Sequence, residues 1–165
     1  MAGCVKKTKR CKQTIDEHMT HPLPRAMKPV IQAEVTGCGI ASVAAIAGVS
    51  YARAKKISNS LGIFAQDKNL WSETAHVRRL LNHCGFRAKS GELPFRSWHS
   101  LPDLALLAIK WHIEKKRPFW HWVVFARDSN GAYVLDSKKA LRNHRRTDFG
   151  RMKPKWYIDI ESKSR

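Results

Sequence analysis

The stretch VIQAEVTGCGIASVAAIAG, residues 30–48, passes from a polar loop through Gly-Cys-Gly into small apolar residues. Apolar side chains recur every three or four positions over residues 40–47, which predicts a helix with one apolar stripe that ends at Gly48. Cys38 lies where this helix is expected to begin. Backbone N–H groups and the helix dipole stabilise a thiolate in a first turn, so Cys38 is a candidate nucleophile. The alternative is an inert packed cysteine.

The glycines on either side of this cysteine, Gly37 and Gly39, lack side-chain bulk. We expect them to let a substrate backbone approach the thiol closely.

Two further segments in the first half are typical of helices. Ser50 is expected to cap the first of them, which ends near Gly62, and Ser72 to cap the second, which ends near Gly85. With the helix that follows Gly37, they predict a first half built from three helices.

The second half is typical of strands. Residues 119–127, FWHWVVFAR, are rich in aromatic and β-branched side chains, and residues 132–136 follow after a DSNG turn, which predicts an antiparallel hairpin. Residues 156–161 alternate apolar and polar side chains as a late strand should, whereas residues 104–113 are β-like or mixed. Helices followed by antiparallel strands predict an α+β fold.

The predicted hairpin also supplies a base for the candidate nucleophile. Of the eight histidines, only His121 lies inside it. Antiparallel pairing across the turn would place Asp136 at the same end, where it can accept from one ring nitrogen and leave the other for Cys38. Gln32, six residues before Cys38, is a candidate oxyanion donor together with the Cys38 backbone N–H.

The stretches IQAEVTGCGIASVAAIAGVSY and FWHWVVFARDSNGAYVLDS together resemble the papain-like cysteine peptidases, and most closely the C39-like, bacteriocin-processing branch. That family places a Gln six residues before a Cys-Gly that opens a helix, then a His strand, then a strand that ends in Asp. The resemblance covers about residues 28–137. It implies a papain-like α+β fold, a peptide or protein substrate and no cofactor. It also implies Cys38 as nucleophile, His121 as base, Asp136 as the orienting acid and Gln32 as the oxyanion donor.

The chain is strongly basic, with a net charge of +18 concentrated at its ends. Residues 1–25 are interpreted as a basic arm and residues 26–162 as the domain, whose C-terminal segment 138–165 is also basic. Such ends either remain solvated or contact an anionic partner, which would be nucleic acid or an acidic protein. Trp111, Trp120 and Trp122 are expected in the core or a cleft wall.

The cysteine pattern indicates a reducing compartment. No secretory leader and no apolar run long enough to span a bilayer is evident, so a cytoplasmic location with free thiols is the expectation. Cys4, Cys11, His18 and His21 form C-x6-C-x6-H-x2-H, which is wider than the spacing of small zinc modules, so no metal site is predicted.

Two alternatives to a peptidase stay open. An acyltransferase would use the same Cys, His and Asp with an amine or thiol as acceptor. A catalytically silent module would instead bind nucleic acid or an acidic partner through its basic ends.

Overall fold

The structure is a computed structural model that describes residues 26–162. The predicted basic arm and the Cys4, Cys11, His18 and His21 pattern therefore lie outside the described residues. The helices of the described part are α1 (Cys38–Ala47), α2 (Tyr51–Ser60) and α3 (Ala75–His83), with short 3-10 helices η1 (Lys68–Trp71) and η2 (Phe149–Arg151). None of them is long and apolar enough to cross a membrane.

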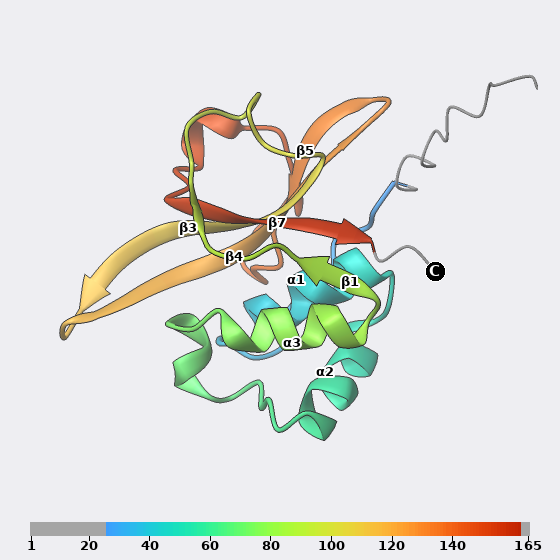
Figure 1. Cartoon of the computed structure of the whole chain (residues 1–165), viewed down its shortest axis with the longest axis vertical. Coiled ribbons are helices and arrows are strands. Elements are labelled where there is room, and N and C mark those ends of the chain that lie inside the picture. The colour runs from blue at the N-terminus through green and yellow to red at the C-terminus, as the bar shows by residue number, and fades with distance from the viewer. Residues whose placement is uncertain (1–25, 163–165) are drawn as a thin grey trace, which may run out of the picture.

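One antiparallel sheet follows the helices and is built from β1 (Phe86–Ala88), β2 (Leu93–Pro94), β3 (Leu104–Glu114), β4 (Arg117–Asp128), β5 (Gly131–Leu135), β6 (Arg145–Arg146) and β7 (Trp156–Ser162). Its strand order is β1-β7-β3-β4-β5-β6, and β2 also pairs with β7. The three α-helices lie together on one side of the sheet (Figure 1). The predicted order of helices first and antiparallel strands second is confirmed.

The central strands are buried on both faces, which explains the continuous apolar run LALLAI in β3. Leu106 and Ala108 face the helices, whereas Ala105, Leu107 and Ile109 belong to a second core on the opposite face. A strand covered on both sides has no polar face, so the alternation that marks a half-buried strand is missing. The β-like interpretation of residues 104–113 is therefore confirmed.

Three tryptophans pack together on the helical side of the sheet. The rings of Trp120, Trp122 and Trp156 meet edge to face, with centroids 5.0 to 5.8 Å apart. Trp120 and Trp122 are buried, as expected, whereas Trp111 is only half-buried.

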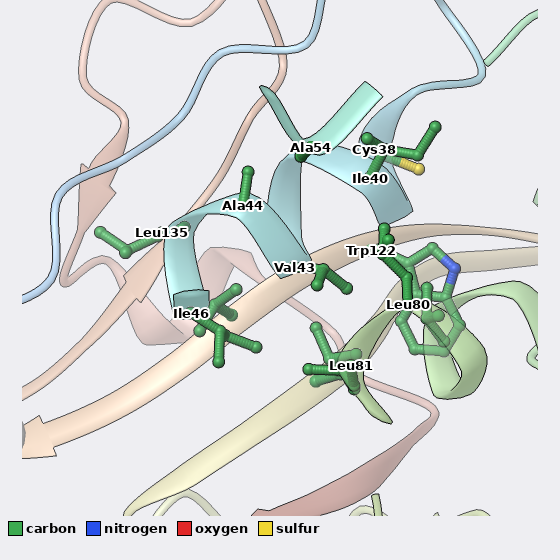
Figure 2. Close-up of a cluster of buried hydrophobic side chains, with 14 of the residues drawn as sticks. Cys38, Ile40, Val43, Ala44, Ile46, Ala54, Leu80, Leu81, Trp122 and Leu135 are labelled. Carbon is green, nitrogen blue, oxygen red and sulfur yellow. The ribbon is translucent and has the colours of Figure 1, made fainter. Parts of the chain in front are cut away.

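Helix α1 is buried on every side, which corrects the prediction of a single apolar stripe. Each residue from Cys38 to Ile46 is buried, including Ser42. The helix packs on β4, α2 and α3 at once, and a helix covered all round is apolar all round. Figure 2 shows Val43 of α1 pointing toward Leu81 of α3, and Leu80 of α3 and Trp122 of β4 belong to the same cluster.

The two other helices begin as follows. The Ser50 side chain accepts a hydrogen bond from the Arg53 N–H at 3.2 Å and caps α2 as predicted. The prediction for α3 is wrong, because Ser72 closes η1 through a bond from its N–H to the Asn69 carbonyl. Thr74 takes the N-cap position of α3 without a side-chain cap.

The basic C-terminal segment is an integral part of the domain. β7 lies between β1 and β3 in the sheet, and its Ile158 is fully buried. Removing residues 138–165 would therefore remove an inner strand, because the long return from β5 to β7 brings the chain back across the sheet. Residues 138–162 are therefore part of the folded domain.

Candidate active site

The predicted nucleophile, base and acid converge where the start of α1 packs against the sheet. Cys38 is the first residue of α1, His121 lies on β4, and Asp136 follows β5 directly. His121 Nε2 and Asp136 Oδ1 are 2.7 Å apart. Antiparallel pairing of β4 with β5 brings them to the same end of the hairpin, as expected from the sequence. Nδ1 is then the ring nitrogen left for the thiol.

Asp136 is fully buried and receives several donors. Its Oδ1 accepts the Lys138 N–H at 3.1 Å as well as the imidazole, and its Oδ2 accepts from Arg146 at 3.0 Å. Burial alone would raise the pKa of this carboxyl, but the hydrogen bond with His121 and these donors lower the pKa to about 2. Asp136 is therefore a carboxylate at any neutral pH.

His121 is held in its protonated form. Burial of the imidazole opposes protonation, but the hydrogen bond with Asp136 and the nearby Cys38 outweigh it and raise the pKa of His121 to about 9. The Cys38 thiol thus lies close enough to the ring to influence its charge. Such a pair of a thiol and an imidazolium is the arrangement that activates a cysteine for nucleophilic attack.

Arg146 is a positioning residue that the sequence did not reveal. Its guanidinium bridges the buried Asp136 and the exposed Asp148, to which it donates two bonds of 2.9 Å each. The backbone of Asp136 is held as well, because its N–H and carbonyl both bond to His144. The only sequence signal was the basic stretch that contains Arg146, and its pairing partner depends on β6 lying beside β5.

Gln32 lies beside the same site but uses its amide differently from the prediction. Its Nε2 donates to the carbonyl oxygens of Glu34 at 2.9 Å and Val35 at 2.8 Å, and its Oε1 accepts from Ser137 Oγ at 2.8 Å. Both amide hydrogens thus bond to backbone carbonyls of the loop that leads to Cys38. The backbone of Gln32 also bonds to Ser137, the residue after Asp136, which ties this loop to the end of β5.

The loop before Cys38 is fastened to α2 and to the following loop. Glu34 accepts from the Tyr51 hydroxyl at 2.5 Å and forms an ion pair with Lys55. Thr36 donates to the carbonyl of Ala65. A Cβ on Gly37 would lie 2.1 Å from the Tyr51 hydroxyl oxygen, so only glycine fits there.

Gly39 also has no space for a side chain. A Cβ on Gly39 would lie 2.5 Å from Nε2 of His76 on α3 and 2.9 Å from Val77. The expectation that Gly37 and Gly39 make room for a substrate is therefore wrong, since Tyr51 and α3 fill the space at the two positions. Both glycines serve close packing within the protein.

His76 is buried beside this site as a neutral imidazole. Neither ring nitrogen has a hydrogen-bond partner within residues 26–162, and burial lowers the pKa to about 4 against a weaker opposing effect of Asp67. An unfolded histidine has a pKa of about 6.5, so between pH 6.5 and 4 the unfolded chain binds a proton that the folded chain does not. The stabilising effect of neutral His76 is complete above pH 6.5 and is lost towards pH 4.

We expect His76→Leu to reduce the acid sensitivity of the fold. Between pH 7 and pH 4.5, the unfolding free energy should fall by about 2–3 kcal/mol more in the wild type than in the variant. Urea titrations at the two pH values measure this difference. His83→Leu, at the exposed end of the same helix, is the matched control and should behave as the wild type. An equal pH response in His76→Leu and the wild type would contradict the assignment.

The Cys38 side chain is closed off in this structure. Its exposed fraction is 0%, and it belongs to the helix-side core, near Trp122 (Figure 2). By comparison, the side chain of His121 is 14% exposed. The thiol is thus next to its candidate base but shielded from solvent.

The chain is similar in structure to a known protease, although no sequence comparison finds a relative. No protein-family model and no curated protein sequence matches the chain. A solved structure does match: a double glycine motif protease from an AMS/PCAT transporter, in complex with the leader peptide. The match has a TM-score of 0.56 at 16% sequence identity, and it covers 85% of this chain and 96% of that chain. The chain therefore has the fold of a double-glycine, C39-type peptidase, as the sequence resemblance predicts.

Proposed function

We propose that this protein is a cysteine peptidase that cleaves peptide bonds with Cys38, His121 and Asp136. The observation that carries the proposal is the buried 2.7 Å hydrogen bond between His121 and Asp136, next to a cysteine at the first residue of a helix. The structurally similar double glycine motif protease was solved in complex with the leader peptide, which makes a peptide with a double-glycine motif the first substrate to test.

Each residue has a defined role in this proposal. Asp136 keeps the imidazole oriented and protonated while Cys38 is a thiolate, which attacks the substrate carbonyl. His121 then gives its proton to the leaving amine, and the acyl group stays on the sulfur. In the second half, neutral His121 accepts a proton from water, the resulting hydroxide attacks the thioester, and the free acid leaves as the thiolate and the imidazolium are restored. No net oxidation occurs.

The site has to open transiently before this chemistry begins. The Cys38 sulfur is covered, and Gln32 directs both amide hydrogens to the Glu34 and Val35 carbonyls. In this proposal, a shift of the loop that carries the Glu34 and Val35 carbonyls would release one Gln32 N–H for the oxyanion. The Cys38 backbone N–H, at the start of α1, is the second donor in this proposal.

The experiment that tests the proposal measures cleavage and thiol reactivity on the full chain. A peptide with a Gly-Gly motif is incubated with the protein, and mass spectrometry identifies the products. Separately, iodoacetamide is added at neutral pH and each cysteine is mapped. We expect cleavage after the motif. We also expect faster alkylation of Cys38 than of Cys84 although Cys38 is buried, because the proposed opening exposes its thiolate transiently, whereas burial raises the pKa of the Cys84 thiol.

A chain that leaves the peptide intact and is alkylated more slowly at Cys38 than at Cys84 would show that the proposal is wrong.

A further inference from the structure

A basic groove lies beside the candidate active site. It has a volume of about 560 Å³, and its charged lining consists of Lys110, Arg146, Arg151, Lys153 and Lys155. No acidic residue lines it. Its volume is within the range of about 300–1,000 Å³ that is typical of ligand sites.

The groove exists because β3 changes its register beside His121. Ile109 still pairs with His121, but the pairing then shifts by a β-bulge before His112 resumes it, and Lys110 in the bulge has a φ of +54°. β7 pairs with β3 only up to Ala108. The chain just before β7 therefore leaves the bulge uncovered on that side, and the groove forms between them.

The positive charge in the groove is mostly uncompensated. Arg146 is paired with Asp136 and Asp148, but Lys110, Lys153 and Lys155 form no ion pair with any acidic residue in the described part of the chain. Burial and the like charge of Lys138 lower the pKa of Lys110. Within residues 26–162, the groove's five cations are near only two carboxylates, Asp136 and Asp148, so a net positive charge remains, and an anionic ligand relieves the repulsion among them.

Two contacts connect the groove to the residues of the candidate site. Arg146 lines the groove and donates to Asp136, and Ile109 lines it and is the strand partner of His121. His121 and Asp136 do not line the groove themselves, so a ligand there is one residue away from the imidazole and its acid. Since the bond to be cleaved must lie next to this imidazole, a substrate that extends past it by a residue or two can reach the groove.

We propose that the basic groove binds acidic side chains of the peptide that is cleaved at Cys38. This inference rests on the proposed function and names the chemical class of its substrate, a peptide with Asp or Glu near the scissile bond. Carboxylates are the peptide groups that lysine and arginine bind most strongly.

A single-stranded nucleic acid fits the groove less well. Base stacking needs an open aromatic face, and the one aromatic ring in the lining, that of Trp111, is covered by the Lys155 ammonium at 4.9 Å from the ring centroid.

The test measures binding without turnover, in the full chain with Cys38→Ala. The probes are a fluorescent Glu-rich peptide with a Gly-Gly motif, the same peptide with Gln in place of Glu, and a single-stranded DNA oligonucleotide of equal charge. Lys110→Gln with Lys153→Gln removes two charges from the groove. Lys68→Gln with Lys115→Gln removes two charges near the tip of the β3–β4 hairpin, where Lys115 also has a positive φ of 48°.

We expect the groove variant to bind the Glu peptide about tenfold more weakly than the parent, because two charged contacts are lost. The hairpin variant should bind as the parent does, and the Gln peptide should bind weakly to all three. If both variants bound the Glu peptide equally weakly, the loss of affinity would come from the lower net charge of the protein and not from the groove, and the inference would be overturned. It would also be overturned if the Gln peptide bound as well as the Glu peptide, or if the oligonucleotide bound more tightly and lost affinity only in the groove variant.

Failure of the proposed function would appear separately, as a wild-type chain that neither cleaves peptide nor shows preferential alkylation at Cys38.

Discussion

Cys38→Ala should abolish peptide cleavage while the domain remains folded. The thiol is the group proposed to form the acyl intermediate, so its removal should reduce turnover by at least about 10⁴-fold, to the level of the uncatalysed reaction in the assay. Quantitative mass spectrometry of the cleaved peptide measures this loss. The hydrogen bonds that Asp136 accepts from His121 and Arg146 do not involve the sulfur, so the rest of the site should persist.

Cys84→Ala is the matched control for this prediction. Cys84 is a half-buried free cysteine at the end of α3, and its removal should leave the cleavage rate unchanged. Circular dichroism and urea unfolding establish that both variants are folded, with an expected cost of about 1 kcal/mol for each substitution. Cleavage that continues in folded Cys38→Ala would rule out the thiol as nucleophile.

Asp136→Asn should lower the cleavage rate by about 10³-fold and move its pH dependence. Asp136 and Cys38 raise the pKa of His121 to about 9, so in the wild type the proton needed by the leaving amine is retained up to that pH. Activity should therefore fall above about pH 9. An amide carries no charge, so the variant should lose its imidazolium at a lower pH, closer to the ordinary histidine value of about 6.5.

A pH–rate profile distinguishes this role from a purely structural one. Asp148→Asn is the control, because Asp148 binds the same Arg146 guanidinium but is exposed and does not contact His121. This control should keep the alkaline limb near pH 9. If Asp136→Asn kept its alkaline limb there as well, the carboxylate would not be the group that holds the proton on His121.

The neighbourhood of the site was only partly predictable. The six-residue spacing from Gln32 to Cys38 indicated that the amide and the thiol are neighbours, but not where the amide hydrogens point. Their direction depends on Ser137, which follows β5 and takes the amide oxygen across a sequence separation of 105 residues. The basic stretch near the C-terminus and its late strand over residues 156–161 were expected, but the place of this strand between β1 and β3 was not. Charge composition does not report which strands pair.

What the sequence determined by itself was local. Helical periodicity after Gly37 placed Cys38 at a helix start, and the DSNG turn set the register that joins His121 to Asp136, since a short turn leaves few ways to pair its strands. Tertiary structure decided the rest. Only packing against Tyr51 and α3 explains Gly37 and Gly39, and only the neighbouring strand β6 delivers Arg146 to Asp136. Such contacts depend on how segments that are far apart in the sequence pack against one another, and a local sequence pattern does not predict this packing.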